Sequence, residues 1–89
     1  MEAMTQTDIK AIIKEYILRE FMPGESPDTL DDSVMLISGY ILDSIGTAKL
    51  GAFLEQTFGI QLEPHEMSAE YLNSLPDIAR IVEWKRAAK

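Results

Sequence analysis

The chain has 89 residues, 46% of them hydrophobic, and 15 acidic against 8 basic side chains give a formal net charge of -7 at pH 7. A chain of this length can bury one modest core, so we expect residues 1–89 to form a single domain without a second lobe or a deep cleft. The negative charge would repel a phosphate backbone, which argues against nucleic acid as a partner.

Cysteine is absent, which excludes disulfides, thiolate metal sites and cysteine nucleophiles. No apolar run reaches the roughly 20 residues that a membrane-spanning helix needs. The N-terminal segment MEAMTQTDIKAIIKEY is charged and amphipathic and lacks the apolar centre of a signal peptide. We therefore expect a soluble, cytoplasmic monomer with no membrane partner.

The first predicted element is an amphipathic helix over residues 6–21. Its apolar side chains recur at the spacing of one helix face: Ile9, Ile12, Ile13, Tyr16, Ile17 and Phe21. Thr5 and Asp8 resemble a capping box at its start, and Pro23-Gly24 supplies a stop.

A long loop follows over residues 22–43, and a short helical turn fits its residues 31–35. We expect its apolar side chains to attach it to the core: Leu30, Val34, Met35, Leu36, Ile37, Ile41 and Leu42. The loop also carries four acidic residues, Glu25, Asp28, Asp31 and Asp32. Their spacing does not match a calcium-binding EF-hand loop, so we expect a solvated acidic loop.

The second helix is predicted over residues 44–58, with Gly59 as its left-handed C-terminal residue. Gly46 and Gly51 should each weaken it by about 1 kcal/mol relative to alanine, so it depends on tertiary packing. In the extended link after it, Ile60 and Leu62 should point inward.

A short third helix is predicted over residues 65–72 and a last helix over residues 75–87, where Ser74 and Asp77 form a second capping box. One face of the last helix carries Leu75, Ile78, Ala79 and Val82. The predicted fold class is all-α, a small bundle of three main helices plus one short helix, with the long loop between the first two.

The usual catalytic constellations are missing from the sequence. The single histidine, His65, lies in a polar link, where we expect it to be exposed, whereas a catalytic triad would hold it against a serine. One histidine without cysteine does not suit zinc, and the scattered glycines do not form a phosphate-binding loop. We expect neither a metal site nor catalytic residues, and hence no enzyme.

Ser44 has two interpretations. Ser44 or Asp43 can cap the second helix, a contact that typically contributes about 1 kcal/mol. Alternatively, a serine that follows a long ordered loop, at the head of a mostly apolar helix in a small acidic protein, is displayed for the active site of another protein.

The segment LDSIGTAKLGAFLEQTFGIQL, residues 42–62, resembles the acyl carrier protein family, which includes the peptidyl carrier domains. It follows the family pattern of Asp-Ser-Leu/Ile at the head of the second helix, then Leu, a Leu-Glu pair, Phe-Gly-Ile and a further aliphatic residue. The order of the predicted helices extends the resemblance over nearly the whole chain.

The resemblance implies that Ser44 is the attachment point of 4′-phosphopantetheine, which a separate, magnesium-dependent phosphopantetheinyl transferase takes from coenzyme A. It also implies that Asp43 helps to engage that transferase and its metal, beyond its favourable position at the positive end of a helix. The thiol of the arm would then carry an acyl or aminoacyl group as a thioester between loading and processing enzymes.

The second helix departs from the commonest family pattern, since Glu55 is its clear acid and Lys49 stands on its expected solvent face. Partner recognition should therefore depend more on apolar and small residues than on ion pairs: Ile45, Thr47, Ala48 and Ala52. We take this to favour a discrete acyl carrier in a dedicated or secondary, polyketide-like pathway. The alternatives are an aminoacyl or peptidyl carrier and, from another class, an unmodified helical adaptor in which Ser44 is only a cap.

Overall fold

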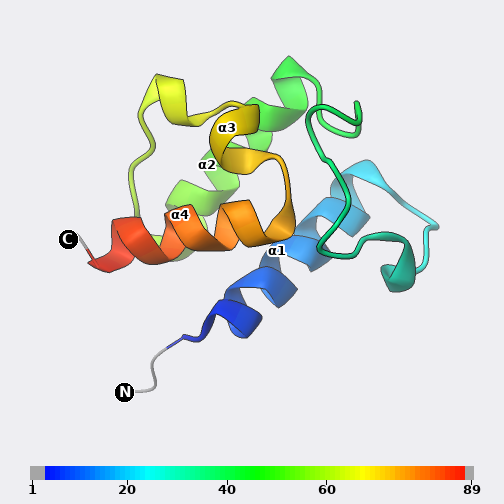
Figure 1. Ribbon diagram of the computed structural model, residues 1–89, viewed down its shortest axis with the longest axis horizontal. Helices are drawn as coiled ribbons and strands as arrows, with labels where there is room; N and C mark the ends of the chain where they lie inside the picture. Colours follow the sequence, from blue (N-terminus) through cyan, green and yellow to red (C-terminus); the bar gives the residue numbers. More distant parts are fainter. Residues whose placement is uncertain (1–3, 88–89) are drawn as a thin grey trace.

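The computed structural model describes residues 4–87, and this part of the chain is an all-helical bundle (Figure 1). Its main helices are α1 (Gln6–Phe21), α2 (Ser44–Phe58) and α4 (Leu75–Ala87), whose bounds coincide with the predicted ranges. The shorter elements are η1 (Pro27–Thr29), η2 (Pro64–Glu66) and α3 (Ala69–Leu72). The predicted fold class is confirmed, and no helix in residues 4–87 is long and apolar enough to cross a membrane.

Helix α1 begins with the predicted capping box. The Asp8 backbone N–H donates to Thr5 Oγ1 at 3.1 Å, and the Thr5 N–H donates to Asp8 Oδ2 at the same distance. The helix buries Ile9, Ile13 and Ile17 completely and packs mainly against α4. The apolar period of the sequence thus selects the face that meets α4.

All the main helices and the connecting segments contribute to one hydrophobic core. Its buried members are Ile9, Ile13, Ile17, Leu30, Leu36, Leu42, Leu50, Leu54, Phe58, Ile60, Leu62, Leu72, Leu75, Ile78, Ala79, Ile81 and Val82. Stacking of Tyr16 on Phe53, with ring centroids 3.9 Å apart, adds a contact between α1 and α2. The expected inward positions of Ile60 and Leu62 and the expected buried face of α4 are confirmed.

The long loop attaches to this core through Leu30, Leu36 and Leu42, which are 2% exposed or less. The prediction for Met35 was wrong, because its side chain is 56% exposed. The expected helical turn over residues 31–35 was also wrong: the helical turn is η1, further upstream.

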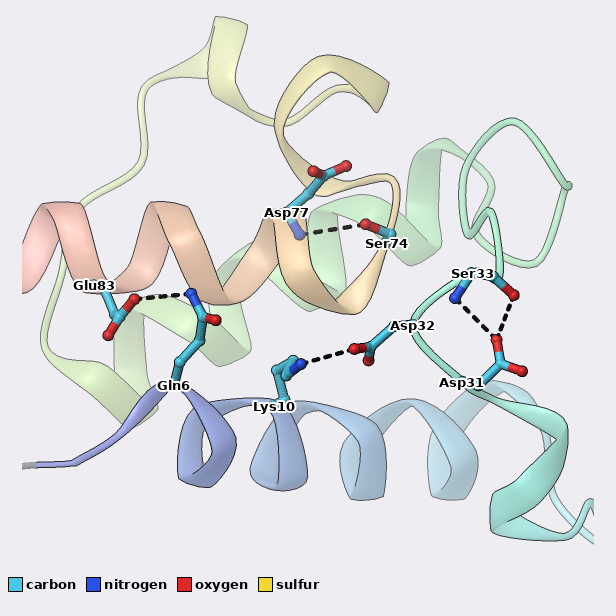
Figure 2. Close-up of polar contacts among 8 residues, drawn as sticks. All are labelled: Gln6, Lys10, Asp31, Asp32, Ser33, Ser74, Asp77 and Glu83. Atoms are coloured by element: carbon cyan, nitrogen blue, oxygen red, sulfur yellow. Dashed lines mark hydrogen bonds and ion pairs between the residues drawn. The ribbon is translucent and has the colours of Figure 1, made fainter.

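A side-chain turn occupies the place of the expected helical turn. Asp31 Oδ1 accepts hydrogen bonds from the Ser33 backbone N–H at 2.9 Å and from Ser33 Oγ at 2.6 Å (Figure 2). Aspartate readily bonds its own backbone in this way, in competition with helix formation. Next to it, an ion pair of 2.8 Å between Lys10 and Asp32 ties the loop to α1.

The predicted third helix is split into η2 and α3. Ser68 has an extended backbone, with φ -150°, and separates the two elements. The interruption lets Met67 pack against α2, where a Cβ on Gly51 would lie 2.7 Å from the Met67 Sδ. Glu66, at the end of η2, is buried and pairs with Lys85 of α4 at 2.8 Å. These two tertiary contacts explain why one continuous helix does not form.

Only one half of the predicted capping box is present at the start of α4: the Asp77 backbone N–H donates to Ser74 Oγ at 3.3 Å (Figure 2), whereas the Asp77 carboxylate pairs with Arg80 at 3.3 Å. Near its other end, the Gln6 side-chain amide donates to Glu83 at 3.0 Å, which joins α4 to the start of α1. The bundle is therefore fixed by polar contacts around its rim as well as by its core.

Candidate functional site

Asp43, and not Ser44, is the N-cap of α2. Its backbone is extended, with φ -89° and ψ -169°, and its Oδ1 accepts a hydrogen bond of 2.7 Å from the Gly46 backbone N–H. Its carbonyl oxygen accepts bonds of 2.8 Å from both the N–H and the hydroxyl of Thr47. The Asp43 side chain therefore satisfies one of the free amides at the start of the helix, that of Gly46, and its carbonyl accepts the first hydrogen bond of the helix.

Ser44 is the first residue of α2, and its side chain is exposed. Because Asp43 is the cap, the helix does not need the Ser44 hydroxyl. No hydrogen bond to any of residues 4–87 occupies that hydroxyl. The side chain is thus a free alcohol at the positive end of a helix, next to a carboxylate.

The close packing behind Ser44 fixes the start of α2. A Cβ on Gly46 would lie 3.1 Å from Phe21 and 3.2 Å from Asp43 Oδ1, so the absence of a side chain lets α2 approach α1 and leaves room for the cap. Both glycines of α2 are sites of close packing, Gly46 against Phe21 and Gly51 against Met67, which agrees with the expectation that this helix depends on tertiary packing.

One predicted recognition residue, Thr47, does not lie on the surface. Its side chain is 7% exposed, and its hydroxyl donates to the Asp43 carbonyl. A β-branched residue with a hydroxyl on Cβ can bond the preceding turn in this way. Thr47 therefore supports the cap and does not belong to the candidate partner face.

The other predicted recognition residues form one exposed stripe along α2. Ile45, Ala48, Lys49 and Ala52 are all exposed, and they follow the i, i+3, i+4, i+7 spacing of a single helix face. Ile45 is 69% exposed although it is apolar. The stripe begins next to Ser44 and contains one charge, that of Lys49.

Two shallow hollows border the start of α2. One, of about 450 Å³, is lined by Ser44 and Ala48 together with Met67 from the far side. The other, of about 280 Å³, is lined by Ile45 and Lys49 together with Phe21. Asp43 and Tyr40 line both hollows. A third hollow, of about 500 Å³ between α3 and α4, shares no lining residue with these two.

Asn73, in the link between α3 and α4, positions the loop that leads to Ser44. Its side-chain oxygen accepts hydrogen bonds from the Ile37 N–H at 2.8 Å and from the Ser38 N–H at 2.9 Å. Its backbone carbonyl accepts a third, of 2.7 Å, from the Leu36 N–H. The sequence does not reveal this role, because the partners of Asn73 lie more than 30 positions away.

Tyr40 is a second residue whose place in the site does not follow from the sequence. Its φ of 67° lies in the left-handed region, and its side chain is 92% exposed. Neither the left-handed backbone nor the high exposure can be predicted from the sequence. A bulky residue rarely adopts a positive φ, and tyrosine is usually intermediate in burial.

His65 is exposed, as predicted, and its ring meets Tyr71 edge-on with centroids 6.1 Å apart. Among residues 4–87 no group of three or more potential ligands could hold a metal ion.

No protein-family model matches the sequence, and comparison with curated proteins finds no match. A functional assignment therefore depends on the Asp-Ser pair and on the geometry at the start of α2.

Proposed function

We propose that the protein is a discrete acyl carrier protein, which holds acyl intermediates as thioesters on a 4′-phosphopantetheine arm attached to Ser44. The observation that carries the proposal is that Ser44 is exposed and released from capping, because Asp43 takes that role. A serine needed only for helix stability would be the cap itself.

The modification requires few chemical groups from this chain. The Ser44 hydroxyl oxygen would attack the phosphorus of coenzyme A that bears the pantetheine group, forming a phosphodiester. The bond to the adenosine bisphosphate would break, and the hydroxyl proton would pass to a base of the transferase. A transferase that supplies base and magnesium needs from its substrate only an accessible hydroxyl and a rigid surface. The exposed Ser44 on a packed helix start meets both requirements.

Asp43 fits a second role in this reaction. One of its carboxylate oxygens, Oδ1, caps α2, and its side chain remains exposed next to Ser44. An exposed carboxylate oxygen is a ligand that magnesium prefers. In the proposal, Asp43 stabilises the helix start and contributes its charge to recognition by the transferase and its metal.

The exposed stripe of α2, formed by Ile45, Ala48, Lys49 and Ala52, is the proposed docking face for loading and processing enzymes. Because most of its side chains are apolar or small, this face suits partners that bind through apolar packing more than through ion pairs. This composition favours a carrier of a dedicated or secondary, polyketide-like pathway over a general fatty-acid carrier, and we propose that this carrier acts in the cytoplasm.

The test is to incubate the purified protein with coenzyme A, magnesium and a transferase of broad specificity, and to measure its intact mass. We expect a gain of one phosphopantetheine in the wild type and none in Ser44→Ala. An equal gain in both proteins, or no gain in the wild type, would overturn the proposal.

Two other functions give different outcomes. The exposed apolar side chain of Ile45 would equally serve an adaptor that binds a partner helix and is never modified. An adaptor would show no mass gain while still binding its partner. For a modified carrier, the mass of the protein isolated from its native cells distinguishes an acyl from an aminoacyl or peptidyl cargo.

A further inference from the structure

Tyr40 combines two features that do not favour stability. Its φ of 67° is one that a bulky residue rarely adopts, because Cβ then approaches the neighbouring carbonyl oxygen. Its side chain is also the most exposed of the large apolar and aromatic ones in residues 4–87, at 92%. The ring therefore gains almost no burial that would offset the backbone strain.

The surrounding loop imposes this backbone conformation. The Tyr40 N–H donates to the Ile37 carbonyl at 3.0 Å, and the Leu42 N–H donates to the Leu36 carbonyl at 2.8 Å. Asn73 holds the start of the same turn through its side-chain oxygen. The turn is thus closed from both ends, and the left-handed residue is part of an ordered structure.

The position preceding Tyr40 is also constrained. A Cβ on Gly39 would clash with the Met35 carbonyl oxygen, so only glycine fits there. Glycine at position 40 would relieve the strain of the left-handed conformation, yet the chain has tyrosine there. The fold therefore does not account for the aromatic ring.

The location of the ring suggests its role. Tyr40 is four residues before Ser44, and it lines both hollows that border the start of α2. Asp43 is the other residue common to the two hollows. A protein that approached Ser44 over either hollow would meet this ring, and rigid exposed tyrosines are frequent anchors of protein interfaces.

We propose that Tyr40 is a specificity-determining contact for the enzyme that modifies Ser44, and that its ring enters an apolar pocket of that transferase. The inference rests on the proposed carrier function and names a residue outside the Asp-Ser pair and the α2 stripe. Tyr40 would act by binding the partner and would not touch the reacting atoms.

The test compares transferase kinetics and melting temperatures of the wild type, Tyr40→Asn and Tyr40→Phe. Asparagine tolerates the left-handed conformation, so Tyr40→Asn should melt no lower than the wild type. Loss of an anchor residue should lower kcat/KM about tenfold or more, through a higher KM for the carrier with kcat unchanged. Tyr40→Phe, which keeps the ring, should retain the wild-type constants.

Trp84→Asn is the matched control, because Trp84 is 58% exposed and lines only the hollow between α3 and α4. It should leave the transferase constants unchanged. Equal kcat/KM for Tyr40→Asn and wild type would overturn the role of Tyr40 while leaving the carrier function intact. A lower melting temperature of Tyr40→Asn would also overturn it, since the ring would then serve the fold. A wild type that is never modified would overturn both proposals.

Discussion

Asp43 Oδ1 accepts a hydrogen bond of 2.7 Å from the Gly46 N–H, so the carboxylate next to Ser44 already has a structural task. A substitution can remove the charge of this side chain while keeping its ability to cap the helix. Asparagine caps about as well as aspartate, so Asp43→Asn should leave the melting temperature nearly unchanged. If the charge helps to position the transferase and its metal, the same substitution should strongly slow the modification of Ser44.

Asp43→Ala completes that comparison, because it removes both properties. It should lower the free energy of unfolding by about 1 kcal/mol, the usual contribution of a helix cap. Unchanged modification kinetics in folded Asp43→Asn would limit Asp43 to its capping role.

Asn73→Ala should loosen the loop before Ser44. It removes the acceptor of the half-buried Ile37 amide and of the exposed Ser38 amide, and the usual net contribution of such a hydrogen bond is about 0.5–1.5 kcal/mol. Asn73→Asp retains a side-chain oxygen as acceptor, although it loses the amide donor to Ser38 Oγ, and should stay closer to the wild type than Asn73→Ala. Amide hydrogen exchange at Ile37 and Ser38 measures the effect directly: exchange should be faster in Asn73→Ala than in Asn73→Asp, and equal protection would contradict the role of Asn73.

The ion pair between Glu66 Oε1 and Lys85 Nζ, which lie 2.8 Å apart, should make the stability of the fold depend on pH. Burial favours the neutral form of Glu66, but hydrogen bonds from Lys85 and from the Glu63 N–H, together with the Lys85 charge, outweigh it and lower the pKa of Glu66 below its usual 4.5. A lowered folded-state pKa gives stability that is fully present above the unfolded-state value and is lost as the pH falls through the folded-state pKa.

Glu66→Gln should therefore be destabilised by about 1.5–3 kcal/mol at pH 7, the usual range for a hydrogen bond to a charged group. The difference in melting temperature from the wild type should shrink as the pH falls below 4.5. Exposed Glu70, whose side chain has no hydrogen bond or ion pair within residues 4–87, provides the control, since Glu70→Gln should melt like the wild type at pH 7. A difference of constant size between neutral and acidic pH would refute the role of the Glu66 charge.

Lys49 tests how charge on the docking face selects partners. It is exposed on the stripe that begins at Ile45 and carries the one charge of that stripe. Lys49→Glu should weaken loading by the native partner and improve docking to enzymes of fatty-acid synthesis. Both effects should fade at high salt, because exposed charges are screened over about 8 Å at physiological ionic strength. Identical loading rates for wild type and variant with both enzymes would leave Lys49 without a role in specificity.

Local patterns in the sequence predict much of this fold. The apolar period ending at Phe21, the cap formed by Thr5 and the left-handed Gly59 set the helix bounds, and Gly59 has φ 67° as expected. These signals act between residues a few positions apart, which is why they can be interpreted without knowing the rest of the structure.

The error in the third helix concerns residues whose conformation is decided by distant partners. Met67 and Glu66 interrupt that helix because they contact Gly51 and Lys85 on other helices. No local period reveals such contacts, since tertiary packing overrides propensity at these positions. Thr47 and Asp31 are different cases, because each makes a local side-chain hydrogen bond, with Asp43 and with Ser33, that competes with the position expected from residue type alone.

The most direct test of the central claim is to locate the arm on the chain by tandem mass spectrometry after incubation with coenzyme A and transferase. Cleavage after Arg19 and Lys49 releases a fragment with four candidate serines: Ser26, Ser33, Ser38 and Ser44. The carrier function predicts one phosphopantetheine, on Ser44 alone, although Ser38 is also exposed. An arm on another serine, or a fragment that stays unmodified, would contradict it.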